Sequence, residues 1–107
     1  MASSMEERQQ AFENKFARDA ELRFKAQARR DKLIGIWAAG HLGKMAEDAE
    51  NYVREVIRID VREAGDEDVF RKLRTDFDAA GVDVSDDDIR RTMVTMMAEA
   101  VDQIQNG

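Results

Sequence analysis

The chain has 107 residues, enough for one small domain with a real core, and its 43% hydrophobic content is typical of a folded protein. It has no cysteine and no proline, which excludes disulfides, thiolate catalysis and cysteine-ligated zinc and leaves long helices uninterrupted. Residues 1–34 carry eight basic and six acidic side chains, whereas residues 35–107 carry nine and seventeen. The net charge of −6 argues against a nucleic-acid partner.

Basic residues cluster only at positions 23–32, where Asp31 interrupts the run of Arg23, Lys25, Arg29, Arg30 and Lys32. A charged run on a helix is typical of a solvated face, so we interpret it in that way. The longest apolar stretch, residues 33–42, is too short to span a bilayer, and residues 1–10 are too polar for a signal peptide. These features predict a cytoplasmic protein without membrane insertion.

A long first helix is predicted to end at Gly40-His41-Leu42-Gly43. Its apolar residues recur every four positions, and we expect the buried stripes of the chain to begin near Ala20 and Phe24 in the row Phe12, Phe16, Ala20, Phe24 and Ala28. At roughly 35 residues, or about 52 Å, this helix is much longer than the others. Its N-terminal turns should therefore project from the bundle or fray, and we predict a mobile N-terminal segment in the free protein.

A second helix is predicted over residues 46–64, with Tyr52 at the edge of a buried stripe formed by Ala49, Val53, Val56, Ile57 and Val61. Gly65 should stop this helix, and Asp66 is a candidate N-cap for a third helix over residues 67–80. One face of the third helix carries Val69, Phe70, Leu73 and Phe77. Gly81 should end it.

Ser85 and Asp88 form a variant of the capping box and predict the start of a fourth helix. Its apolar positions are Ile89, Met93, Met96, Met97, Ala100 and Ile104. The methionines fit a core by their helical spacing, although an adaptable docking face is an alternative. Short connections between amphipathic helices predict an all-α protein, a four-helix bundle with a long first helix.

No catalytic pattern is present. The Gly35–Gly40 spacing is that of a phosphate-binding loop, but His41-Leu42 stands where Lys-Ser/Thr is required. His41 is the single histidine, and we interpret it as a capping or packing residue. The acidic runs at 66–68 and 86–88 lack the alternating ligands of a calcium loop and fit helix N-termini better. We expect no enzyme activity, no metal and no cofactor.

Asp60 lies in the row of the second helix that contains Val53, Ile57 and Ala64. A carboxylate on a buried stripe must be paired or hydrogen-bonded, so we predict a structural buried acid. Lys72 or an arginine of the third helix is a possible partner across the short turn. A perturbed acid in such a place also fits a functional site, which remains the alternative.

Three blocks carry a resemblance to a known family: FENKFARDAELRFKAQARR at residues 12–30, LIGIWAAGHLGK at 33–44 and AGDEDVFRKL at 64–73. In this order and spacing they closely resemble the alphaproteobacterial zeta subunits, the ATPase inhibitor subunits of the F-type ATP synthase. The resemblance covers nearly the whole chain. It implies a four-helix bundle with an N-terminal inhibitory segment that is flexible when free and helical when bound.

By that resemblance, residues 1–19 would be the flexible inhibitory segment and residues 20–107 the bundle. The segment would insert as a helix into an α/β catalytic interface close to the central rotor and block ATP hydrolysis. The candidate contact residues are Arg8, Phe12, Lys15, Phe16 and Arg18. The free protein would be a monomer, and the bound one would lie at the cytoplasmic face of the inner membrane.

The alternative function is a small helical sensor that binds a nucleotide or another ligand without catalysis, through a Trp37-lined interior or the acidic helix starts. The chain has no recognisable phosphate cradle to support it. The two functions differ in which residues matter: the N-terminal segment for an inhibitor, and the surroundings of Trp37 for a sensor.

Overall fold

The computed structural model describes the backbone of residues 2–62 and 66–106 and the side chains of residues 20–60 and 66–106. Four helices follow one another: α1 (Ala2–His41), α2 (Ala46–Arg62), α3 (Glu67–Ala80) and α4 (Asp86–Asn106). The described residues contain no strand. The prediction of an all-α protein with a long first helix is confirmed.

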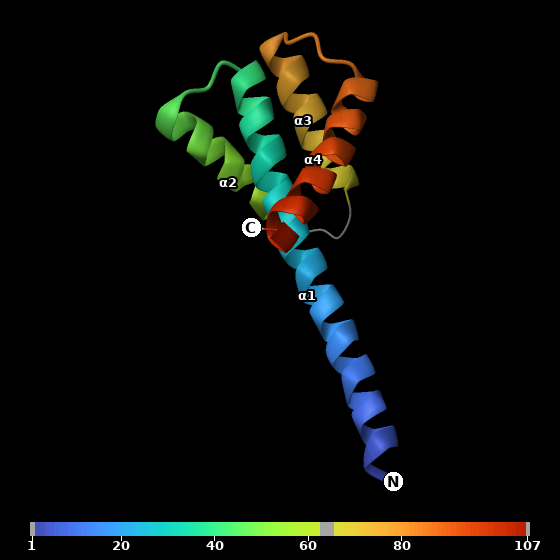
Figure 1. The fold of residues 1–107 in the computed structure, drawn as a ribbon. Helices are drawn as coiled ribbons and strands as arrows, with labels where there is room; N and C mark the ends of the chain where they lie inside the picture. The colour runs from blue at the N-terminus through green and yellow to red at the C-terminus, as the bar shows by residue number, and fades with distance from the viewer. Residues whose placement is uncertain (1, 63–65, 107) are drawn as a thin grey trace.

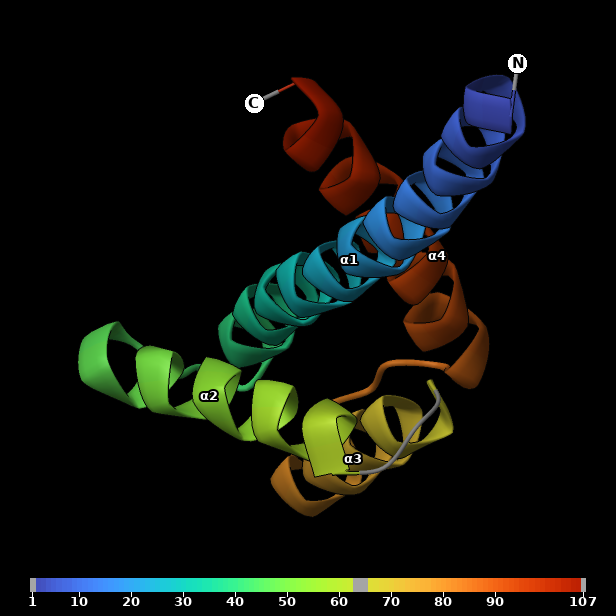
Figure 2. The same ribbon diagram turned by 90° about the horizontal axis from the view of Figure 1, so that it is seen from below.

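α1 determines the shape of the molecule. Its 40 residues correspond to about 60 Å of helix, and the molecule measures 67 × 24 × 22 Å. The C-terminal half of α1 lies between α2 and α4, while its N-terminal half extends beyond the other helices (Figure 1). Seen from below, α4 crosses α1 near the point where α1 leaves the bundle (Figure 2). The predicted projection of the first helix is therefore confirmed.

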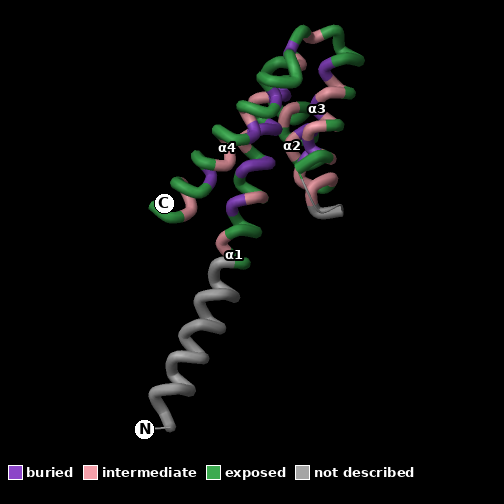
Figure 3. Tube along the Cα trace, turned by 90° about the vertical axis from the view of Figure 1, so that its right-hand side faces the viewer, coloured by how far each residue is buried: buried purple, intermediate pink, exposed green. Residues whose placement is uncertain are grey.

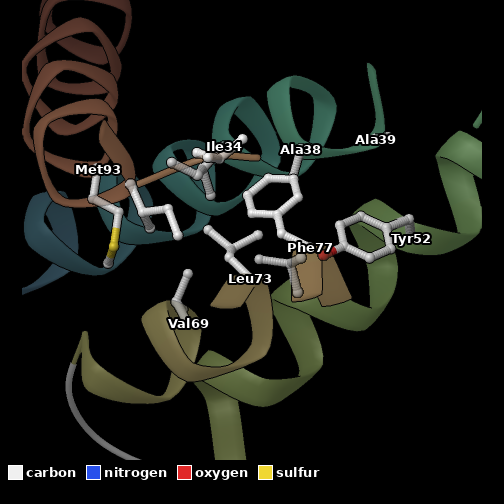
Figure 4. Close-up of a cluster of buried hydrophobic side chains, with 11 residues drawn as sticks. Ile34, Ala38, Ala39, Tyr52, Val69, Leu73, Phe77 and Met93 are labelled. Carbon is white, nitrogen blue, oxygen red and sulfur yellow. The ribbon is translucent and has the colours of Figure 1, made fainter. Parts of the chain in front are cut away.

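The core forms where all four helices meet (Figure 4). Its largest fully buried apolar side chains are those expected from the apolar spacing of α3 and α4, namely Val69, Leu73, Phe77 and Ile89, together with Ile34 of α1 and Val56 of α2. Tyr52, expected at an edge, is only 3% exposed, because its hydroxyl donates a hydrogen bond to Asp76 Oδ2 at 2.8 Å. The hydroxyl is satisfied there, so the ring can be buried.

The expected start of the buried stripe on α1 is wrong. Phe24 is 65% exposed, and Ala20 and Ala28 are exposed as well. The buried row is displaced by two residues, to Ala26, Arg30, Ile34 and Ala38. The C-terminal part of α4 lies along the Ala26 side of α1. That side has the same four-residue spacing as the row that contains Phe24, so spacing alone did not decide which of the two is buried.

Two of the predicted stop signals and one predicted start signal are confirmed. Gly43 and Gly81 follow α1 and α3 in left-handed conformations, with φ of 72° and 69°. The Ser85 hydroxyl accepts a hydrogen bond from the Asp88 backbone N–H at 3.1 Å and caps α4. The predicted stop at Gly65 lies outside the described residues.

A close approach of α1 and α2 depends on Gly35. A β-carbon at this position would lie 3.1 Å from Val53 Cα, so only glycine fits without movement of α2. No helix in the described part of the chain is long and apolar enough to cross a membrane.

Candidate partner-binding arm and its buried anchor

The predicted N-terminal segment, residues 1–19, is called here the arm. From Ala2 onward its backbone belongs to α1. Figure 1 shows this part of the helix away from α2, α3 and α4. The candidate contact side chains lie outside the described residues: Arg8, Phe12, Lys15, Phe16 and Arg18. Their roles remain a prediction.

C-terminal to the arm, α1 is held by a cluster of four charged residues, called here the anchor: Arg30, Asp31, Asp60 and Asp66. Arg30 is 1% exposed and donates hydrogen bonds to Asp31 Oδ1 at 2.9 Å and to Asp66 Oδ1 at 2.8 Å. Its Nη2 lies 3.6 Å from Asp60 Oδ2 and makes no hydrogen bond. One guanidinium thus connects α1 to the end of α2 and the start of α3.

The burial of Arg30 and Asp31 corrects the interpretation of residues 23–32 as a solvated face. Arg23, Lys25, Arg29 and Lys32 are exposed, but Arg30 and Asp31 are each 1% exposed. Figure 3 shows the buried positions of α1 within the bundle. A signal was available in the sequence: Arg30 lies midway in the four-residue spacing from Ala26 to Ile34.

Asp60 lies on the inner side of α2, and its side chain is 12% exposed. The partner considered on α3 is not the one found, because the Asp60 carboxylate faces Arg30 of α1. Lys72 is engaged elsewhere, 3.1 Å from Glu55 and 3.0 Å from Asp76. Lys72 is thus paired with these two carboxylates and not with Asp60.

Asp66 precedes α3 but does not cap it through its side chain, contrary to the sequence prediction. Its carboxylate instead accepts the 2.8 Å hydrogen bond from Arg30. A charged hydrogen bond to a buried guanidinium is stronger than a bond to a backbone N–H, which explains the preference. The Asp66 side chain is 57% exposed, so the anchor opens to solvent on this side.

The anchor has one cation and three acids, and burial determines which of these groups are protonated. Desolvation, the hydrogen bond to Asp60 and the Asp60 charge raise the pKa of Asp31 to about 8, against the opposing effect of Arg30. Burial alone would lower the pKa of Arg30, but hydrogen bonding to Asp66 and the charge of Asp31 raise it. The buried acid therefore holds a proton at neutral pH while the guanidinium stays charged.

The aromatic residues at the far end of α1 pack against one another. The Trp37 ring meets the rings of His41 and Phe77 edge-on, with centroids 4.7 Å and 5.6 Å away. His41 is a packing residue, as expected. The described residues include no group of three or more histidine or acidic side chains placed to hold a metal ion. Met93 is buried in the core, and Met96 packs against it.

Comparison with known proteins gives two positive findings. The sequence model of a family described as "ATPase inhibitor subunit zeta" matches residues 1–103. A protein with a solution NMR structure is 40% identical, over 79% of this chain and 96% of that chain, with a TM-score of 0.70. No curated protein matches the chain.

Proposed function

We propose that this chain, which belongs to the ATPase inhibitor subunit zeta family, inhibits ATP hydrolysis by inserting its arm as a helix into the F-type ATP synthase. The family supports an inhibitory role at the ATP synthase, and the role of such a subunit is regulatory rather than catalytic. The finer mechanism is our proposal: the arm enters an α/β catalytic interface beside the central rotor. The bundle, residues 20–107, stays outside and holds the arm in position.

The observation that supports this mechanism is the length of α1 relative to its bundle. The first described residue of α1 that is buried is Ala26, and the helix begins at Ala2. The part of α1 that belongs to the arm, residues 2–19, corresponds to about 27 Å of helix, which is long enough to enter an interface between subunits. A helix of this length without neighbours is marginal in water, and a groove in a partner would stabilise it.

Within the arm, the contacts divide by chemistry. Phe12 and Phe16 are four residues apart and share one face of any helix, so we assign them as apolar anchors. Arg8, Lys15 and Arg18 would meet acidic surfaces of the α and β subunits and guide the approach. The bound protein would then be peripheral to the membrane, at the cytoplasmic face.

The test is an ATP hydrolysis assay on the isolated F-type catalytic complex, with the full chain added. We expect inhibition, and its loss when residues 1–18 are deleted. The double substitution of Phe12 and Phe16 by alanine should weaken inhibition about thirtyfold, since truncated anchors commonly lose 2 kcal/mol or more.

The matched control is Phe24→Ala, which removes an exposed phenylalanine from the same helix outside the arm. We expect this variant to inhibit like the unmodified chain. Equal inhibition by the full chain and the 1–18 deletion would refute insertion of the arm. In that case the bundle itself would be the inhibitory surface.

A further inference from the structure

We propose that the groove between α1 and the C-terminal part of α4 is a second docking surface for the same partner, and that it receives an acidic amphipathic helix. This inference rests on the proposed function, because it assumes that the arm is held by a partner. The surface is called here the collar groove. It is defined by Leu22, Arg23, Ala26, Met97, Val101 and Ile104.

The collar groove has the shape and polarity of a helix-binding site. It is an open hollow of about 340 Å³ between α1 and α4. The two helices cross in this region (Figure 2). Ala26 forms its floor at 5% exposure, Leu22, Met97 and Ile104 are half-buried, and Val101 is 36% exposed. Four larger apolar side chains around a small residue leave room for apolar anchors of a second helix.

The charge around the collar groove determines the partner. Arg23 lies in the groove itself, and on the other side of Ile104 a hollow of about 360 Å³ is lined by Lys25, Arg29 and Lys32. All four basic residues are exposed. Three acids lie nearby: Glu21 is 3.3 Å from Lys25, Glu99 accepts at 3.4 Å from Gln103, whose Oε1 in turn accepts from Arg29 at 3.2 Å, and Asp102 follows Val101 on α4. The four basic side chains outnumber them, so the region keeps a positive charge. A partner that fits here carries acidic residues beside its apolar ones.

The position of the collar groove ties it to the arm. Leu22 follows the last arm residue, Asp19, by three positions on the same helix, which is about 4.5 Å along the axis. A partner that encloses residues 5–19 must therefore end within about one helical turn of the groove. Its rim would cover the groove without any movement of the bundle.

The test compares two valines on α4. Val101 lines the collar groove, whereas Val94 is 71% exposed and does not line it. In the ATP hydrolysis assay we expect Val101→Glu to raise the half-inhibitory concentration about tenfold and Val94→Glu to change it less than about twofold. Val101→Lys should weaken inhibition less than Val101→Glu, because only the glutamate repels an acidic helix.

The outcomes separate this inference from the proposed function. If the full chain does not inhibit, the proposed function fails. If the full chain inhibits and the 1–18 deletion does not, but Val101→Glu acts like Val94→Glu, only the collar groove proposal is overturned. Thermal melts of each variant check that the bundle is folded. A dimer in sedimentation experiments that Val101→Glu dissociates would also overturn the proposal, because the occupant would be a second copy of this chain.

Discussion

Replacing Arg30 by methionine is the sharpest test of the anchor. Methionine keeps an unbranched side chain of similar length but removes the single cation among three acids. Arg30 is 1% exposed, and three carboxylates lie within 2.8–3.6 Å of it. The substitution therefore leaves the carboxyl groups of Asp31 and Asp60 without the guanidinium that faces them.

The expected loss follows from that geometry. Removing one partner of a buried ion pair costs 3–5 kcal/mol, and we expect about 3 kcal/mol because Asp31 can hold a proton and Asp66 can turn to water. For a domain of this size the melting temperature should fall by about 15 °C. The matched control is Asp60→Asn, which removes one of the three acids and leaves the cation. We expect it to cost less than about 1 kcal/mol, since the cluster has more acids than it can pair.

The measurement is urea unfolding followed by far-ultraviolet circular dichroism. A second variant, Arg30→Met with Asp31→Asn, removes both charges, and at about pH 9 it should recover at least about 1 kcal/mol of the loss. A single substitution that costs less than about 1 kcal/mol would refute the reasoning, as would a double variant no more stable than the single one.

Three further predictions concern pH, packing and the arm. The pKa of Asp31 is raised from 3.8 to about 8 in the folded chain, so its proton stabilises the fold fully below about pH 4 and this stability is lost as the pH rises through 8. The free energy of unfolding should fall by up to about 1.4 kcal/mol per pH unit in that window, and Asp31→Asn should flatten the slope. Gly35→Val should cost about 1–3 kcal/mol by pushing on Val53, whereas Gly40→Ala, with no atom within 4 Å of the new carbon, should be neutral or stabilising in urea unfolding. Backbone NMR relaxation should give lower order parameters for residues 5–15 than for residues 30–40, and uniform rigidity over both ranges would contradict the predicted mobility.

The helices and most of the core could be predicted from the sequence because their signals are local. Gly81 and Ser85 act within one helical turn, and Leu73 and Phe77 repeat with the helical period. The resemblance to the zeta subunits is likewise a property of the sequence and does not depend on how the helices pack.

The anchor could not be predicted in the same way because its partners are distant in sequence. Arg30 and Asp66 are 36 positions apart, and their hydrogen bond exists only once α1 and α3 are packed. A charged residue in a charged run is usually solvated. Arg30 can be buried here because carboxylates at the end of α2 and just before α3 lie next to its guanidinium. The exposure of Phe24 has a similar cause, since α4 packs against a face of α1 that periodicity did not select.

One helix performs two tasks in this protein, and the anchor explains how they are compatible. The C-terminal half of α1 forms a wall of the core, and its N-terminal half is the proposed arm. A helix transmits its direction along its length, so the orientation of the arm depends on how firmly α1 is fixed in the bundle. Arg30 fixes it to α2 and α3 at a point 11 residues, or about 17 Å, from the end of the arm. A buried ion pair has a defined geometry, whereas apolar contacts alone tolerate sliding, and buried ionic groups can thereby specify register. The arm and the collar groove lie on the same length of helix, so fixing α1 sets both for one partner surface.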